Sequence, residues 1–201
     1  MQRIAILSLS LAAIFATTGA SAQTFTGRIG INSLNPKSDN GLVAGAKADV
    51  STDTSFTLGG SYYIDDNWEI AVDTASKYGH DVSLAGLGKV ATLKHMPVTV
   101  GVNYNFNGTE TVKPFVGLGY AYVRVSDEKG VGALTGTNIN IYNSKGFTAV
   151  AGLDYHINEK YFLRGDIRYI DFDSDVVVNG AKVGTASVDP IVYGVSVGMK
   201  F

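Results

Sequence analysis

VTVGVNYNF, at residues 98–106, alternates without a break between large apolar residues and small or polar ones. The large residues are Val98, Val100, Val102, Tyr104 and Phe106. A repeat of two residues places successive side chains on opposite faces of an extended chain. This stretch is therefore predicted to form a β-strand with one apolar face.

The same alternation occurs in seven further segments on both sides of this stretch. In most of them Val, Ile, Leu, Tyr and Phe share one face, while Gly, Ser, Asn and charged residues gather on the other. These segments are residues 25–32, 55–64, 68–73, 114–122, 147–157, 161–169 and 191–201. Together with residues 98–106 they make eight predicted strands.

The connections between the predicted strands are short and long in turn. The short ones are tight turns at residues 65–67, 107–111 and 158–160, made of residues that tolerate unusual backbone angles. The long ones, at residues 34–54, 78–92, 126–143 and 175–187, are rich in Gly, Ser and charge. We therefore expect turns at one end of the fold and loops at the other.

The last of these long segments contains a hairpin signal. Asn179-Gly180 separates the apolar residues 176–178 from Lys182 and Val183, and an Asn-Gly pair in this setting favours a type I′ turn. We expect this hairpin to extend beyond the membrane, with its apolar residues either packed on other loops or shaping a ligand entrance.

The apolar faces of the strands are expected to contact lipid. A soluble β-sandwich buries its large residues between two sheets and has shorter strands. Here the strands reach about 10 residues, the length that crosses a bilayer at a tilt. Backbone polar groups in hydrocarbon must pair internally, which a closed barrel achieves. The sequence thus predicts an all-β fold, a transmembrane eight-stranded antiparallel up-and-down β-barrel.

Two further features agree with a barrel. Aromatic residues near the strand ends are typical of the two interfacial girdles of such proteins. They include Tyr62, Trp68, Tyr104, Tyr161, Tyr169 and Phe201. An even number of strands also places both chain ends at the turn end. No later apolar run reaches 18 residues, so a membrane-spanning helix is not predicted.

Residues 1–22 have the order of a secretory signal peptide. Arg3 precedes an apolar run at residues 4–16, and Ala20-Ser21-Ala22 supplies the small residues for cleavage. A transmembrane anchor or a buried helix is the alternative, but the run is shorter than the ~20 residues that span a bilayer. We expect residues 1–22 to be cleaved and residues 23–201 to form the barrel.

Composition narrows the function classes. The formal net charge of −2 over 201 residues is too small for the basic surface of a nucleic-acid-binding protein. The chain has no Cys, which excludes disulfides and thiolate metal sites. The mature chain is expected to be an exported, mildly acidic protein that does not bind nucleic acid.

Charged residues lie on the predicted inward faces. They include Glu69 and Asp73 on one strand and Arg164, Asp166 and Arg168 on another. Eight strands leave an interior that side chains nearly fill, and enclosed opposite charges pair. We expect these five residues to form a network that partly plugs the lumen. The network is either a structural salt-bridge core or a constriction that sets conductance and ion preference.

Other candidate sites are set aside. His80, His95 and His156 are expected on a loop, near a strand end and on an inward face, too far apart for one metal. Asp81, His80 and Ser83 are adjacent loop residues, which do not make a catalytic triad. The one Gly-x-Ser-x-Gly match, at residues 194–198, lies inside a predicted strand and not at the strand-to-helix turn of a nucleophile elbow, and no phosphate-binding loop occurs. The sequence therefore predicts no enzyme, no metal and no cofactor.

Several segments, taken together in their order, resemble the outer membrane protein W (OmpW) family of Gram-negative bacteria. They are Ala91–Pro97, Lys113–Gly119, Asp154–Asn158, Asp189-Pro190 and Gly198–Phe201. The resemblance implies an eight-stranded barrel with periplasmic turns and a narrow apolar interior, associated with passage of small hydrophobic molecules. The inward-facing charges depart from a wholly apolar tunnel.

The C-terminal segment is also similar to the signal that the outer-membrane assembly machinery recognises in this class. Its residues are Tyr193, Val195, Val197, Met199 and Phe201. We expect the assembly machinery, outer-membrane lipid and small-molecule solutes as partners.

Two functions follow from this reading. The first is a porin-like, narrow passive channel for small, hydrophobic or zwitterionic molecules, with short turns in the periplasm and long loops outside the cell. The alternative is a non-conducting surface barrel whose extracellular loops serve as a receptor or adhesion site, since rigid scaffolds often present recognition loops.

Overall fold

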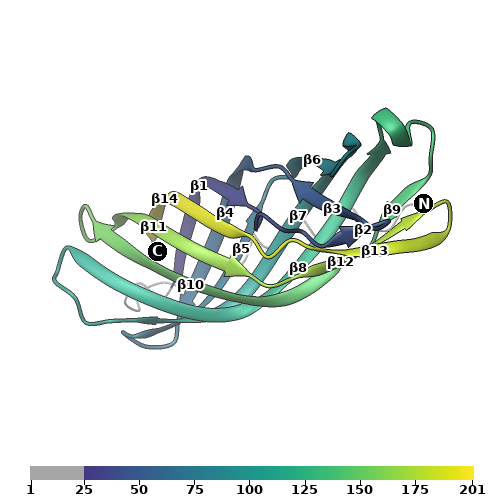
Figure 1. The fold of residues 1–201 in the computed structure, drawn as a ribbon. Coiled ribbons are helices and arrows are strands. Elements are labelled where there is room, and N and C mark those ends of the chain that lie inside the picture. Colours follow the sequence, from purple (N-terminus) through teal and green to yellow (C-terminus); the bar gives the residue numbers. More distant parts are fainter. Residues whose placement is uncertain (1–24) are drawn as a thin grey trace, which may run out of the picture.

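A computed structural model describes residues 25–201 as a closed β-barrel (Figure 1). The barrel strands are β1 (Phe25–Asn35), β4 (Asp53–Tyr63), β5 (Trp68–Ala75), β7 (Gly88–Asn105), β8 (Val112–Gly130), β10 (Ser144–His156), β11 (Tyr161–Ile170) and β14 (Ile191–Lys200). Each pairs antiparallel with the next, and β14 pairs back with β1. The predicted eight-stranded up-and-down barrel is confirmed. The predicted signal segment lies outside the described residues.

The barrel closes at the pairing of its first and last strands. Thr26 is opposite Lys200 and Asn35 is opposite Ile191, so the register is unbroken over the whole contact. The backbone N–H of Phe201 donates to the carbonyl of Phe25 at 2.9 Å. The start of β1 and the end of β14 therefore lie at the end of the barrel that carries the tight turns, as the even strand number predicts.

Large apolar side chains cover the outside of the barrel. Phe56, Leu118 and Phe147 are 76%, 74% and 72% exposed, an arrangement that water would disfavour and hydrocarbon accommodates. At the turn end, the ring centres of Trp68 on β5 and Tyr104 on β7 lie 4.9 Å apart, an arrangement typical of an aromatic girdle. Within residues 25–201 no helix has the length and apolar character to cross a membrane.

The long connections differ from the expected loops. Strands β7 and β8 continue well past the apolar belt, and six short strands join them. These are β2 (Leu42–Val43), β3 (Ala46–Val50), β6 (Tyr78–Leu84), β9 (Ile139–Ile141), β12 (Asp173–Val178) and β13 (Ala181–Ser187). A 3₁₀ turn, η2 (Gly132–Leu134), follows β8. The prediction of loops is wrong for most of this end, and only the hairpin around Asn179-Gly180 was predicted there.

The short strands have a small apolar core of their own. It contains Val43, Ala48, Leu84, Val90, Ala91, Ile139 and Val176. In the hairpin β12–β13, Asn179 and Gly180 have φ of 50° and 85°, the left-handed values that a type I′ turn requires. The predicted hairpin is confirmed, and Val178 and Val183 pack against this core, as one of the two expectations stated.

Candidate functional site

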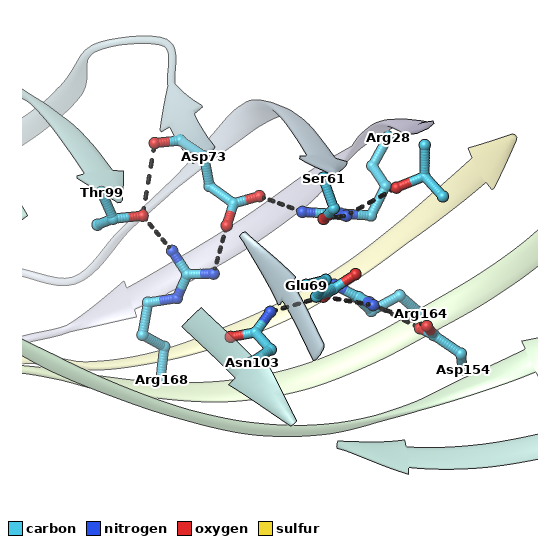
Figure 2. A network of polar contacts seen from close by, with 10 residues as sticks. Arg28, Ser61, Glu69, Asp73, Thr99, Asn103, Asp154, Arg164 and Arg168 are labelled. Atoms are coloured by element: carbon cyan, nitrogen blue, oxygen red, sulfur yellow. Dashed lines mark hydrogen bonds and ion pairs between the residues drawn. The ribbon is translucent and has the colours of Figure 1, made fainter. Parts of the chain in front are cut away.

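The interior of the barrel holds a network of polar side chains (Figure 2). Its members come from six of the eight barrel strands: Arg28 on β1, Ser61 on β4, Glu69 and Asp73 on β5, Thr99 and Asn103 on β7, Asp154 on β10, and Arg164 and Arg168 on β11. Residues an even number of positions apart share one face of a strand. The spacing of four on β5 and on β11 therefore directs both residues of each strand inward.

The half of the network nearer the turn end is centred on Arg164. Its Nε and Nη2 donate to the two carboxylate oxygens of Asp154 at 2.6 and 2.7 Å. Its Nη1 lies 3.3 Å from Oε1 of Glu69, which also accepts a hydrogen bond from Asn103 at 2.7 Å. All four residues are buried. One buried guanidinium therefore faces two carboxylates, and its pair with Asp154 has the bidentate geometry of a strong ion pair.

The half nearer the loop end is centred on Asp73. Its Oδ1 pairs with Arg28 at 2.8 Å and its Oδ2 with Arg168 at 2.9 Å, so one carboxylate links β1 to β11 through the lumen. Arg168 also donates to Thr99 at 2.7 Å, and Arg28 donates to Ser61 at 2.6 Å. The side chains of Asp73 and Arg168 keep 22% and 14% of their surface exposed, so this half is less enclosed than the Arg164 half.

Asp166, which was expected in the network, does not join it. Its side chain makes no ion pair or hydrogen bond with the described residues, and its Oδ1 is buried without a partner. Arg164 and Arg168 on either side already pair with Asp154, Glu69 and Asp73. The carboxylate of Asp166 faces a cavity of about 40 Å³, which holds a few water molecules at most.

Several residues of the network were not among the sequence candidates. The predicted inward faces carry Asp154, Asn103 and Thr99. The number of charged residues on those faces was the signal that could have pointed to Asp154. The aromatic contact of Arg164 was also missed: its guanidinium carbon lies 4.1 Å from the ring centre of Phe115. A single large residue on a face otherwise made of Gly and Ala was the signal there.

Glycines on the inward faces make room for these side chains. A Cβ at Gly59 would lie 2.1 Å from Oδ1 of Asp73 and 3.0 Å from Nη2 of Arg28. A Cβ at Gly117 would lie 1.9 Å from Oδ1 of Asn103. The small residues of the wall and the long polar side chains of the lumen are therefore complementary in volume.

The lumen becomes apolar toward the loop end. A buried cluster there consists of Leu34, Ala75, Tyr78, Ala121, Val123, Ile170, Phe172, Val188 and Val192. Leu34, Tyr78, Ile170 and Val192 also border the cavity that Asp166 faces. A molecule entering from the loop end would thus contact an apolar layer first and the charged layer after it.

Two histidines meet above this cluster, contrary to expectation. His80 on β6 and His95 on β7 stack with ring centres 4.7 Å apart and planes 8° from parallel. The expectation that the histidines are scattered is wrong for this pair, because β6 was not predicted as a strand and its pairing brings Tyr78 opposite His95. Among residues 25–201, no three metal-ligating His, Cys, Asp or Glu side chains gather.

The wall has an irregular position near the middle of β7. Strand β5 ends at Ala75 and β6 begins at Tyr78, and both pair with β7. Pro97 has no N–H for the ladder, and its carbonyl accepts from Thr74 Oγ1 at 3.0 Å. An apolar hollow of about 640 Å³ on the outer wall nearby is lined by Ile29, Ile31, Phe56, Leu58, Met96 and Val197, among others.

The residues of the expected assembly signal lie along β14 and just after it. Tyr193, Val195 and Val197 face outward and are about half exposed, as is Phe201 at the end of the chain. Met199 is half-buried on the same strand. In the folded barrel this face contacts lipid.

Comparisons with known proteins agree with this architecture. The model of the family described as "OmpW family" matches residues 23–201. Outer membrane protein W of Vibrio cholerae is 29% identical over 98% of this chain and 95% of that protein. The crystal structure of OprG from Pseudomonas aeruginosa superposes with a TM-score of 0.77 and 29% identity, covering 91% of this chain and 98% of that one.

A more distant relative is named after an operon. The dibenzothiophene metabolism operon protein PahQ of Pseudomonas aeruginosa is 23% identical over 100% of both chains. The family match spans the whole barrel, from before β1 to the last residue. The closed eight-stranded wall, its lipid-facing exterior and this match together place the chain in the outer membrane, and it belongs to the OmpW family.

Proposed function

We propose that the barrel is a narrow passive channel for small hydrophobic or zwitterionic molecules, with its turns in the periplasm and its strand-rich loops outside the cell. The observation that supports this most is the sequence of layers in the lumen. An apolar cluster is followed by a layer that carries both signs of charge. Such a path suits a solute with an apolar body and, for zwitterions, two opposite charges.

The Asp73–Arg168 pair is the proposed constriction. A free space of about 40 Å³ beside it admits water but no organic solute, so passage requires a side chain to move. Arg168 is the more mobile candidate because it is partly exposed and makes two polar contacts. Arg164 is held by two carboxylates and stacks on Phe115, so it stays in place on the turn-end side of the constriction.

Two observations support an apolar class of solute. The name of the relative PahQ associates that protein with an operon for metabolism of dibenzothiophene, an apolar aromatic compound. In this chain the hollow on the outer wall lies next to the irregular position at Pro97, beside the apolar layer of the lumen. An apolar solute leaving the lumen at this level would meet lipid instead of the charged layer.

Liposome uptake tests the proposal. Vesicles with and without purified protein are exposed to solutes of graded polarity, and swelling or entrapped-dye response reports entry. Faster entry of small apolar or zwitterionic solutes with protein supports the channel. Equal rates with and without protein for the whole series overturn it.

A non-conducting scaffold is the second candidate function. The loop-end strands have their own apolar core, so they form a fixed surface of the kind that presents recognition residues. Impermeable vesicles combined with specific binding of a host or phage component at this surface would favour the scaffold over the channel.

Sidedness and processing are proposed together with the function. The chain has no Cys, so single cysteines are clean labels. Ala133→Cys on η2 is expected to react with an impermeant maleimide on intact cells, whereas Glu159→Cys in a tight turn is not. The reverse pattern would overturn the orientation. Intact mass of the membrane protein tests the proposed removal of residues 1–22.

A further inference from the structure

Three neighbouring strands change from apolar to cationic on their lipid-facing side. On β8 the outward residues Tyr120 and Tyr122 are followed by Arg124, and on β10 the outward Phe147 is preceded by Lys145. On β7, Met96 is preceded by Lys94. All three cations are exposed and lie on the loop-end side of the apolar belt.

The register places these cations in one row. Arg124 is opposite Met96 on β7, and Lys94 lies two residues further along that strand. On the other side, Lys145 is opposite Tyr122, two residues before Arg124. Each lysine is therefore a diagonal neighbour of Arg124, at about 7–8 Å between backbones. We call Lys94, Arg124 and Lys145 the basic row.

The basic row is poorly neutralised within the described part of the chain. The side chains of Arg124 and Lys145 make no ion pair or hydrogen bond there. Lys94 lies 3.7 Å from Asp127, a carboxylate already paired with Lys77 at 3.0 Å. Lys94 and Lys77 thus share one carboxylate, on a chain whose overall formal charge is −2.

The other strands do not repeat this pattern at the same boundary. There the first outward residue beyond the apolar belt is Ser33 on β1, Thr54 on β4 and Asp171 after β11. A uniform solubilising rim would carry similar residues all round the barrel. The basic row is therefore a one-sided feature that ends where Asp171 and Asp173 begin.

We propose that the basic row binds the phosphate groups of a phosphorylated glycolipid in the outer leaflet. Cations at the edge of the hydrocarbon extend toward headgroup phosphates while their stems stay against apolar surface. The guanidinium of Arg124, at the centre of the row, can hold one phosphate through two parallel hydrogen bonds. Tyr122 and Phe147 directly below offer apolar and aromatic surface to the acyl chains of the same lipid.

The proposal uses the outward orientation of the loops but not the conduction of solutes. Binding is measured on detergent-purified protein, where neither orientation nor transport affects the result. The labelling experiment with Ala133→Cys and Glu159→Cys reports orientation separately. Failure of the lipid site is thus distinguishable from failure of the channel.

The test compares a diphosphorylated glycolipid with its fully dephosphorylated form by native mass spectrometry of the detergent complex. The variant carries Lys94→Gln, Arg124→Gln and Lys145→Gln. The control carries Lys47→Gln, Lys89→Gln and Lys182→Gln, three exposed loop-end lysines with acidic partners, and loses the same charge. We expect at least tenfold weaker binding of the phosphorylated lipid by the variant and unchanged binding by the control.

Several results would overturn the proposal. They are equal binding by variant and wild type, an equal loss in the control, or equal binding of the dephosphorylated lipid. Inorganic phosphate that displaces the lipid at the lipid's own concentration would assign the row to a free anion instead. Arg124→Lys keeps the charge and guards against loss of folding. We expect it to weaken binding by about threefold to tenfold through loss of the paired hydrogen bonds. Unchanged binding by this variant would contradict the role of the guanidinium.

Discussion

Arg164 and Asp154 are opposite residues of the paired strands β11 and β10, and their side chains form two hydrogen bonds at 2.6 and 2.7 Å. The wall register thus sets the position of a buried ion pair in the lumen. Glu69 approaches the same guanidinium from β5. The barrel wall and the lumen network are consequently one cooperative unit.

Replacing Arg164 is expected to destabilise the barrel strongly. Arg164→Met leaves the carboxylates of Asp154 and Glu69 buried without their cation, a change that costs roughly 3–5 kcal/mol. The free energy of unfolding in urea, measured in lipid vesicles, checks this. Lys160→Met in an exposed turn is the control and is expected to change it by less than about 0.5 kcal/mol. Equal stability of Arg164→Met and wild type would contradict the structural role of the pair.

Replacing Arg168 is expected to alter conduction more than stability. Arg168→Ala removes the side chain beside the free space and leaves Asp73 with Arg28 as its remaining partner. In planar bilayers we expect a larger single-channel conductance and a shift toward cation preference, because the lumen loses one positive charge. Unchanged conductance and selectivity would assign Arg168 to the structural core alone.

The inward glycines provide a test of fit. Gly59→Ala places a methyl group 2.1 Å from Oδ1 of Asp73, so the Asp73 ion pairs must shift. Gly165→Ala, on the outward face of β11, adds the same methyl group where no atom lies within 4 Å. We expect a lower urea midpoint and altered conductance for Gly59→Ala and no change in either for Gly165→Ala. Identical behaviour of the two variants would show that the lumen network adapts to the added volume.

The strands that cross the membrane could be predicted from the sequence, and the strands beyond it could not. Residues 98–106 alternate because one face of the strand contacts lipid and the other faces the lumen. Every two successive residues therefore differ in polarity, which makes the strand recognisable. At β2 or β9 only two or three residues pair, which is too short for a period to emerge. Their existence depends on a shared core contributed by distant segments, which single-strand patterns do not encode.

The lumen charges were found by the same reasoning, and the expected network includes the observed pairs of Arg164 with Glu69 and of Arg168 with Asp73. The pair of Arg164 with Asp154 was not predicted. Alternation fixes which face Arg164, Asp166 and Arg168 occupy, and all three point inward. Which acid each arginine meets depends on strand register and barrel shear, which no local pattern specifies. This is why Asp154 was not anticipated as the partner of Arg164 and why Asp166 was expected in pairs that it does not make.

The pair of His80 and His95 is expected to make the loop end sensitive to acid. His80 lies on β6, outside the membrane-spanning part, and burial lowers its pKa below the usual 6.5 although Asp53 and Asp81 act in the opposite direction. A locally unfolded β6 therefore binds a proton more readily than the folded one. The contribution of His80 to the stability of β6 is thus fully present above pH about 6.5 and falls as the pH decreases toward the lowered pKa.

The amide hydrogen exchange of β6, corrected for intrinsic rates, is expected to be several-fold faster at pH 5.5 than at pH 7.5. His80→Phe keeps the ring stack with His95 without a titrating group at position 80 and should reduce this difference, whereas His156→Gln at the turn end should retain it. Equal protection of β6 at both pH values in the wild type would show that the buried ring does not control this part of the fold.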